Sequence, residues 1–252
     1  MNHHRTLVSE HTYDRIGVGY VHRRMPDPRI AAVLWSALGD AESIVNVGAG
    51  TGSYEPRDRR VVAVEPAIAM IRQRPTFSAP VVRACAEALP FRDGSFAAAL
   101  AVLTIHHWSD WRAGLRELVR VSRRKVVLFT WDPLSDGSWL NDYFPHLIDT
   151  DRLRFPSLTA LQEILGEIEI AAVPIPHDCT DGFMGAYWRR PFAYLDPSVR
   201  SAISSLANAA SSVSLATLAD DLHTGAWEVK HGHVLKRQEI DLGYRLVVAS
   251  CR

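Results

Sequence analysis

The apolar positions in the first half of the chain fall into short, nearly continuous runs. Such runs are typical of strands that are buried on both faces of a parallel sheet. They predict strands at residues 44–47, 61–64, 81–83, 97–103 and 126–130. Apolar residues also recur at helical spacing over residues 28–38 and 111–121, which predicts two helices. Strands that alternate with helices indicate an α/β fold.

The second half of the chain has a less regular pattern. Residues 131–156 are rich in aromatic and turn-forming types and are expected to be mainly loops. A helix is predicted over residues 157–167, where Ser157 suits the N-cap position. Residues 182–222 are rich in Ala and Ser and are expected to be helical. Further strands are predicted at residues 169–173, 227–235 and 244–249.

This order of elements predicts one α/β domain over residues 1–252. We expect a doubly wound, mostly parallel, seven-stranded sheet of Rossmann-like type. The late helical block would form a cap inserted before the last strand. Ligands of open α/β sheets bind at the carboxyl ends of the strands, so the cap is expected to lie over the binding edge.

Composition and charge narrow the choice of partners. The chain has 28 Lys and Arg against 28 Asp and Glu, a formal net charge of +0, so neither nucleic acid nor an anionic membrane is expected as a partner. The short basic run at residues 123–125 is expected to be a solvated turn. The three cysteines lack C-x-x-C spacing and no apolar run is long enough to cross a bilayer, which favours a cytoplasmic protein with reduced thiols. No metal is expected, because no cysteine or carboxylate pattern joins the histidines.

The strongest chemical signal is IVNVGAGTG at residues 44–52, followed by VVAVEP at residues 61–66. Alternate glycines remove Cβ atoms where the backbone turns sharply against a ligand, and a carboxylate ending the next strand can accept both hydroxyls of a ribose. A dinucleotide fingerprint that starts at Gly48 needs a glycine where the chain has Ser53. The pattern therefore favours a nucleoside cofactor held by a G-x-G-x-G loop and Glu65. The alternative is a glycine-rich turn between two buried strands.

Two further segments follow in order, CAEALPFRDGSF at residues 85–96 and AVLTIHHWSD at residues 101–110. With them, residues 40–130 resemble the cofactor-binding half of class I S-adenosylmethionine-dependent methyltransferases. The resemblance is to the small-molecule type similar to ubiquinone/menaquinone-biosynthesis and natural-product enzymes. It implies S-adenosylmethionine as the cofactor and S-adenosylhomocysteine as the product.

The resemblance also implies which residues hold the cofactor. The methionine part would lie on the glycine loop, the ribose on Glu65, the adenine beside residues 85–87, and the sulfonium near Leu103 or Thr104. The cofactor-binding set is Gly48, Ala49, Gly50, Gly52, Glu65, Pro66, Met70, Cys85, Ala86, Glu87 and Leu103. Tyr13, in an N-terminal lid of residues 1–25, would cover the site. For Met70, a plain core position is the alternative.

Three features depart from the family pattern. Asn46 stands where an acid usually precedes the first glycine, and Cys85 stands where an acid usually pairs with the adenine amino group. Only Ser53–Arg60 separates the glycine loop from the second strand, and Pro56 interrupts it, so a full crossover helix cannot fit. A phosphate would then lack the helix N-terminus that usually binds it, which weakens a dinucleotide reading more than an S-adenosylmethionine reading.

Candidate catalytic side chains follow the fourth and fifth predicted strands. His106 and His107 are expected at the methyl position, and an imidazole pKa of about 6.5 suits a general base. Because neighbouring side chains at a strand end diverge, one of the two is expected to face the acceptor, and His107 is preferred. By resemblance, Asp132 would orient the acceptor. The alternatives are core positions for the histidines and a plain turn acid before Pro133.

Aromatic side chains mark a candidate acceptor-binding cap at residues 131–156 and 174–222. Large rings offer stacking surfaces for a small molecule. The candidate substrate contacts are Trp108, Trp131, Phe183, Tyr187 and Trp188. The alternative is a helical cap that only packs on the sheet.

These observations predict an enzyme that transfers a methyl group from S-adenosylmethionine to an O or N atom of a small molecule. The acceptor would be aromatic or natural-product-like, and the enzyme a monomer or homodimer. One alternative is a nicotinamide-dependent oxidoreductase, which Ser53 and the missing crossover helix disfavour. The other is a protein that binds S-adenosylmethionine without turnover, which Asn46 and Cys85 leave open.

Overall fold

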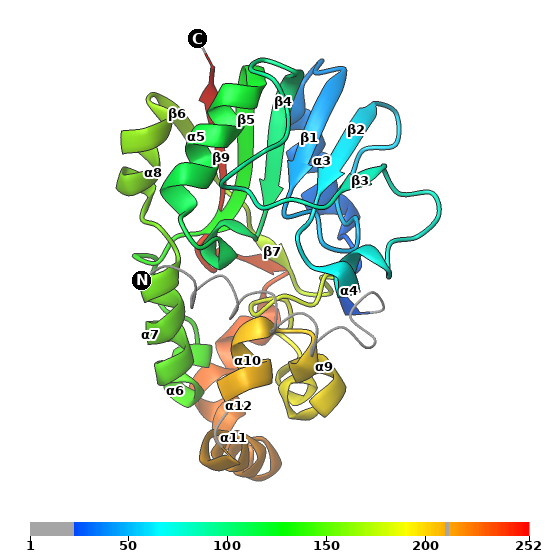
Figure 1. Ribbon diagram of the computed structural model, residues 1–252. Helices are drawn as coiled ribbons and strands as arrows, with labels where there is room; N and C mark the ends of the chain where they lie inside the picture. Colours follow the sequence, from blue (N-terminus) through cyan, green and yellow to red (C-terminus); the bar gives the residue numbers. More distant parts are fainter. Residues whose placement is uncertain (1–22, 210–211, 252) are drawn as a thin grey trace, which may run out of the picture.

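The computed structural model describes residues 23–209 and 212–251, built around a seven-stranded sheet of order β3-β2-β1-β4-β5-β9-β6 (Figure 1). The strands are β1 (Ser43–Val47), β2 (Arg60–Val64), β3 (Val81–Val82), β4 (Phe96–Val102), β5 (Ser122–Trp131), β6 (Ile168–Ala172) and β9 (Tyr244–Ser250). Strand β9 runs antiparallel to β5 and β6, and the other pairings are parallel. The predicted Rossmann-like sheet is confirmed. Tyr13 and all but the end of the expected lid lie outside the described residues.

Three helices cover the two faces of the sheet: α3 (Pro28–Leu38), α5 (Trp111–Val121) and α8 (Leu158–Leu165). Helices α5 and α8 lie on one face and α3 on the other (Figure 1). Their first turns are capped by the side chains of Asp27, Asp110 and Ser157, each of which accepts a backbone N–H bond. The predicted helices and the Ser157 cap are therefore confirmed.

A second body of short elements lies beyond the carboxyl ends of β1, β2 and β4, below the sheet in Figure 1. Its elements are α6 (Leu140–Tyr143), α7 (Pro145–Arg154), β7 (Ile175–Pro176), η2 (Pro191–Leu195), α9 (Pro197–Ser201), α10 (Ser204–Ala209), α11 (Ser212–Thr224), α12 (Ala226–His231), η3 (Gly232–Lys236) and β8 (Glu239–Ile240). Most of this cap is inserted between β6 and the last strand, β9, as predicted. Strands β7 and β8 pair with each other in a small antiparallel sheet.

Three predictions of local structure are wrong. Residues 227–235 form α12 and η3 rather than a strand, because the buried Trp227 and His231 lie one helical turn apart after Gly225, whose φ is 80°. Residues 131–156 contain α6 and α7 and are not mainly loop; Pro145 suits the first turn of α7. The basic run at residues 123–125 lies inside β5, where Lys125 pairs with both β4 and β9.

The link between β1 and β2 contains no helix and is held instead by a buried ion pair. Arg74 Nη2 lies 2.7 Å from Glu55 Oε1, with the two side chains 4% and 6% exposed. The Glu55 carboxylate also accepts the backbone N–H of Ala79, and Arg74 donates to the carbonyl oxygen of Gly50 at 3.2 Å. A side-chain bridge thus supports the glycine loop where a crossover helix usually packs.

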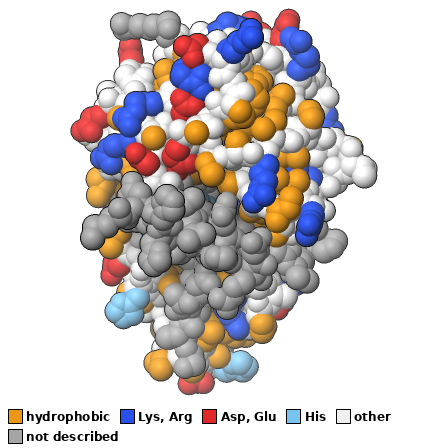
Figure 2. All heavy atoms as spheres, in the orientation of Figure 1, with side chains coloured by type: hydrophobic (Ala, Val, Ile, Leu, Met, Phe, Trp, Pro, Cys, Tyr) orange, Lys and Arg blue, Asp and Glu red, His pale blue; other side chains and the backbone are white. Residues whose placement is uncertain are grey.

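Charged side chains are distributed over the sheet half of the molecule without forming a block of one sign on the face seen in Figure 2, where Lys and Arg are interspersed with Asp and Glu. Within the described part of the chain, no helix is long and apolar enough to cross a membrane.

Candidate functional site

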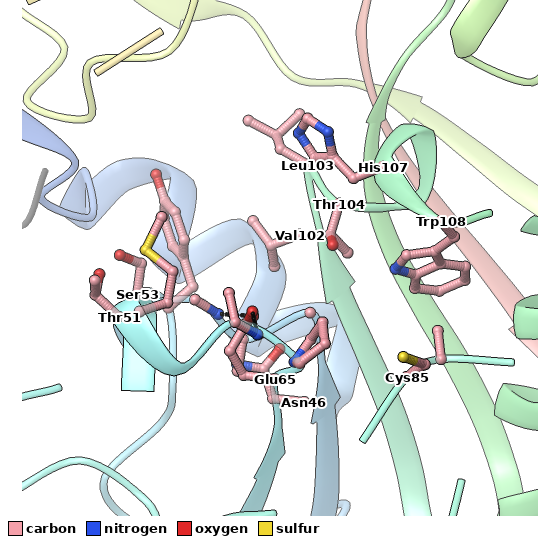
Figure 3. A pocket seen from close by; sticks show the side chains of 18 of the residues that line it. Asn46, Thr51, Ser53, Glu65, Cys85, Val102, Leu103, Thr104, His107 and Trp108 are labelled. Atoms are coloured by element: carbon pink, nitrogen blue, oxygen red, sulfur yellow. Dashed lines mark hydrogen bonds between the residues drawn. The ribbon is translucent and has the colours of Figure 1, made fainter. Parts of the chain in front are cut away.

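A cavity opens where β1, β2 and β4 end (Figure 3). Ten of the predicted cofactor residues line it: Gly48, Ala49, Gly50, Glu65, Pro66, Met70, Cys85, Ala86, Glu87 and Leu103. Gly52 does not line the cavity. A Cβ at Gly52 would instead lie 2.9 Å from Ser78 Oγ and 3.3 Å from the Glu55 carboxylate, so this glycine makes room for the support beneath the loop.

The glycine loop has a backbone that only glycine tolerates well. Gly48 has a φ of 70° and Gly50 a φ of 53°. A Cβ on Gly48 would overlap the hydroxyl of Thr104, which follows β4, whereas a Cβ on Gly50 would meet no atom within 4 Å. The backbone N–H groups of Gly48 and Ala49 both donate to the carbonyl oxygen of Val64. The loop therefore turns tightly across the ends of two strands and leaves space above Gly50.

Glu65 directly follows β2 and points its carboxylate under the loop. One carboxylate oxygen accepts the N–H of Gly50 at 2.8 Å and the other accepts the N–H of Ala67 at 2.9 Å. The residue is 6% exposed, and burial raises the pKa of its carboxyl. Each carboxylate oxygen has a second lone pair, so the two fixed bonds orient the group and leave capacity for two hydroxyl donors.

The two residues that depart from the family pattern also line this cavity. The amide nitrogen of Asn46 donates to Glu55 Oε1 at 3.3 Å, so Asn46 joins the bridge that supports the loop. Cys85 lies opposite Asn46 and beside Trp108 in Figure 3. Glu87 accepts bonds from Ser109 Oγ and the N–H of Asp110, which anchors the 85–87 segment to the start of α5.

Arg24 is a cavity residue that the sequence pattern missed. It is the one Arg or Lys among the described residues that line the cavity. Its Nε donates to Asp181 Oδ1 at 2.6 Å, and Asp181 Oδ2 accepts a bond from the hydroxyl of Tyr54 at 2.9 Å. Arg24 lies in an irregular polar segment and meets its partner from 157 residues away, so no local periodicity signals its role.

A second cavity adjoins the first and extends into the cap. Arg24, Leu103 and His107 line both cavities, which meet at the end of β4. The walls of the second cavity mix polar and apolar side chains and include four aromatic rings, those of Trp131, Phe155, Phe183 and Tyr244. Two of the predicted substrate residues, Trp131 and Phe183, thus lie on this cavity, while Trp108 lies on the first.

The two histidines are in the place that the sequence predicts, in the single 3-10 turn after β4. His107 lines both cavities and His106 only the second, where its ring stacks on Phe155 with centroids 3.8 Å apart. Burial, aided by the positive charges of Arg154 and Arg24, lowers the pKa of His107 to about 3. Burial also lowers the pKa of His106. The ordinary pKa assumed from the sequence is therefore wrong, and both imidazoles are neutral near pH 7.

Three other predicted residues do not reach either cavity. The carboxylate of Asp132 accepts the N–H of Leu134 at 3.0 Å, so this acid caps the turn after β5. Trp188 is fully buried and donates to the carbonyl oxygen of Ile175, and Tyr187 is 8% exposed. Both rings belong to the apolar core of the cap. For these residues the turn and packing alternatives describe the structure.

The first cavity combines groups suited to one kind of ligand. A buried carboxylate is positioned for vicinal hydroxyls, the guanidinium of Arg24 lies in the wall and is bonded through Nε to Asp181, and Met70 and Ala86 offer apolar contact. Among the described residues, no helix lies behind the loop and Arg24 is the one Arg or Lys of the cavity wall, so these residues offer little support to a pyrophosphate. The fold and the cavity therefore define a nucleoside-cofactor protein whose ligand carries an amino-acid rather than a diphosphate group.

Comparisons with known proteins identify the family. A family model described as a methyltransferase domain matches residues 45–130. A solved structure from Anabaena variabilis, assigned to a methyltransferase of an antibiotic biosynthesis pathway, is 36% identical, has a TM-score of 0.84, and covers 90% of this chain and 99% of its own. The chain belongs to the class I S-adenosylmethionine-dependent methyltransferases, and its cofactor is S-adenosylmethionine. The nicotinamide alternative is set aside.

More distant structures share the fold. A protein of Thermotoga maritima described as a possible histamine N-methyltransferase has a TM-score of 0.59 at 16% identity, covering 96% of this chain and 99% of its own. Geranyl diphosphate C-methyltransferase of Streptomyces coelicolor has a TM-score of 0.50 at 14% identity, covering 88% of this chain and 78% of its own. No curated protein matches the sequence.

Proposed function

We propose that this methyltransferase transfers the methyl group of S-adenosylmethionine to an O or N atom of a small molecule held in the second cavity. One observation carries the proposal: the two cavities meet at Leu103 and His107, at the end of β4. A cofactor in the first cavity with its sulfonium near Leu103 would present the methyl to whatever occupies the second. The four aromatic rings in the wall of the second cavity favour a flat or ring-containing acceptor.

The first cavity would hold the cofactor along its length. Gly48, Ala49 and Gly50 lie where the methionine part would approach the backbone, and Arg24 supplies a cation for its carboxylate. Glu65 would accept the ribose hydroxyls. Five other predicted cofactor residues that line the cavity, Pro66, Met70, Cys85, Ala86 and Glu87, would surround the adenine. In this arrangement, residues 40–130 form most of the donor site, which is the site that binds the methyl donor S-adenosylmethionine.

The cap would form the acceptor site. Lining residues of the second cavity come from both proposed cap segments, for example Leu140 and Phe155 in the first and Phe183 in the second. Leu242 and Tyr244, at the start of β9, complete the wall. The expected lid at residues 1–25 would close over the cofactor, and Arg24 is the end of that segment.

Methyl transfer requires mainly that the protein align the acceptor atom with the methyl group. Bound S-adenosylmethionine supplies an electrophilic methyl on a positively charged sulfur. Holding the two reactants in line contributes about 7–11 kcal/mol to lowering a barrier of this kind. His107 is neutral, so it can accept the hydrogen bond of an acceptor hydroxyl and fix its oxygen toward the methyl. The pKa of His107 is about 3, so its imidazole would take the proton of the acceptor hydroxyl only late, once formation of the bond to the methyl has made that oxygen acidic. The imidazole would then release this proton to water.

The low pKa of His107 predicts the pH dependence of this step. Because the imidazole is protonated only as the pH falls toward about 3, its capacity to accept a bond is constant from about pH 5 to 8. With an acceptor that does not titrate in this range, kcat/KM should show no inflection near pH 6.5. The measurement is a pH–rate profile for the wild type and for His107→Asn. An acidic limb near pH 6.5 in the wild type that vanishes in His107→Asn would contradict this.

Transfer of labelled methyl tests the proposed function. The protein is incubated with methyl-labelled S-adenosylmethionine and a panel of phenols, hydroxylated polyketides and amines, and products are separated by chromatography. We expect label in at least one small molecule, attached to O or N. Tight binding of S-adenosylhomocysteine together with no transfer to any acceptor would favour a binding protein without turnover.

A further inference from the structure

Asp151 is a buried carboxylate in the wall of the second cavity. It lies in the last turn of α7, is 8% exposed, and its Oδ2 accepts the hydroxyl of Ser205, which lies on α10, at 2.6 Å. Helices α7 and α10 contact each other in the cap. Among the described residues, no side chain forms an ion pair with Asp151.

The stability of the fold does not explain a carboxylate at this buried position. A negative charge in the last turn of a helix faces the negative end of the helix dipole. Removing a carboxylate from water is costly unless a cation or several donors compensate for it, and one serine hydroxyl is a small compensation. Burial accordingly raises the pKa of Asp151. The Asp151 carboxylate therefore has the properties of the negative member of an ion pair.

The positive charges around the cavity have other partners or lie outside it. Arg24 is paired with Asp181 at 2.6 Å, and Arg152 with Asp149 at 3.3 Å. Arg154 is exposed and acts on Asp151 only as a nearby charge; it is not part of the cavity wall. The remaining acid of the cavity, Asp136, is exposed at the rim. Within the described part of the chain, the cavity wall therefore holds one buried carboxylate, that of Asp151, without a cationic partner.

Four aromatic rings in the same cavity wall also suit a cationic ligand. Rings of Trp, Tyr and Phe attract organic cations through their π faces, and a chamber that combines such rings with one buried carboxylate is suited to an ammonium group. Phe155 and Trp131 lie edge to face with centroids 5.5 Å apart, and Phe183 and Tyr244 lie 4.7 Å apart on the same cavity. A ligand carboxylate would instead be repelled by Asp151.

We propose that the acceptor carries a protonated amine and that Asp151 anchors this ammonium group in the second cavity. This inference rests on the proposed function. Asp151 lines only the second cavity, whereas Leu103 and His107 lie at the junction with the cofactor site. The ammonium is therefore an anchor remote from the atom that receives the methyl, and methylation takes place at another O or N atom of the same molecule.

Binding of matched probes tests the anchor without requiring turnover. Calorimetry in saturating S-adenosylhomocysteine compares tyramine with 4-propylphenol and tryptamine with 3-propylindole, pairs that differ mainly in an ammonium against a methyl. We expect at least one amine to bind about tenfold more tightly than its neutral partner. Asp151→Asn keeps the size of the side chain and an acceptor for Ser205, and should reduce this preference to about twofold or less. Asp220→Asn, which replaces an exposed acid of the cap that lines neither cavity, is the control and should retain it.

The comparison in the wild type is decisive even if Asp151→Asn does not fold. Neutral probes that bind as tightly as the amines, no measurable binding of either amine, or a preference that survives Asp151→Asn would each overturn the inference. Failure of the proposed function looks different: the amine preference would persist while labelled methyl reaches no acceptor. The affinity for S-adenosylhomocysteine, measured alone, confirms that each variant retains its cofactor cavity.

Discussion

Glu65→Ala is expected to weaken binding of S-adenosylmethionine by about ten- to a hundredfold. Hydrogen bonds to a charged acceptor contribute about 1.5–3 kcal/mol, and each 1.4 kcal/mol corresponds to about a factor of ten. The substitution removes the acceptor proposed for the ribose hydroxyls. It also leaves the N–H groups of Gly50 and Ala67 without the partners that hold the loop at 2.8 and 2.9 Å. Isothermal titration with S-adenosylhomocysteine measures the change.

Two further variants serve as controls for the affinity measured with Glu65→Ala. Glu42→Ala removes an exposed acid just before β1 and should leave the affinity unchanged. Glu65→Gln preserves the shape but places an amide nitrogen against one of two backbone N–H groups, so it should fall between wild type and Glu65→Ala. An affinity of Glu65→Ala equal to that of the wild type would exclude the ribose role.

Arg74→Ala is expected to lower the free energy of unfolding by about 3–5 kcal/mol. Removal of one member of a buried ion pair leaves the other charge uncompensated, and here the Glu55 side chain, 6% exposed in the intact pair, would lose its guanidinium. The Gly50 carbonyl would lose a donor as well, so the cofactor affinity should also decrease. Chemical denaturation monitored by circular dichroism gives the stability change.

The matched control for Arg74 is Arg72→Ala, which removes an exposed arginine close by in the chain and should change stability by less than about 0.5 kcal/mol. A loss of less than about 1 kcal/mol for Arg74→Ala would show that the short link does not depend on the ion pair. The double variant Glu55→Ala/Arg74→Ala should be less destabilised than the sum of the single variants, because it leaves no lone buried charge.

The donor site was predictable because its signals are local in sequence. The glycine loop and Glu65 lie within a strand, turn and strand that follow each other directly, and the backbone geometry of Gly48 is a property of that turn. The absence of a crossover helix followed from the length of Ser53–Arg60. What replaces that helix, the pair of Glu55 and Arg74, could not be predicted, because the two residues meet only after the sheet has formed.

The acceptor side was less predictable because its determinants are tertiary. Trp188 and Phe183 are equally aromatic in the sequence, but one is fully buried in the cap core and the other lines a cavity. The pKa of His107 depends on burial and on the charges of Arg24 and Arg154, which come from distant segments. Patterns of residue type identify where chemistry is possible, and packing decides which side chains take part.

Filling the second cavity while sparing the first tests the proposed donor and acceptor arrangement most directly. Met184 lines only the second cavity, and Phe192 is 57% exposed elsewhere in the cap, so Met184→Trp and Phe192→Trp form a matched pair. We predict that Met184→Trp reduces transfer of labelled methyl at least about tenfold with unchanged affinity for S-adenosylhomocysteine, and that Phe192→Trp affects neither. Full transfer by Met184→Trp would show that the acceptor binds elsewhere and would contradict the arrangement.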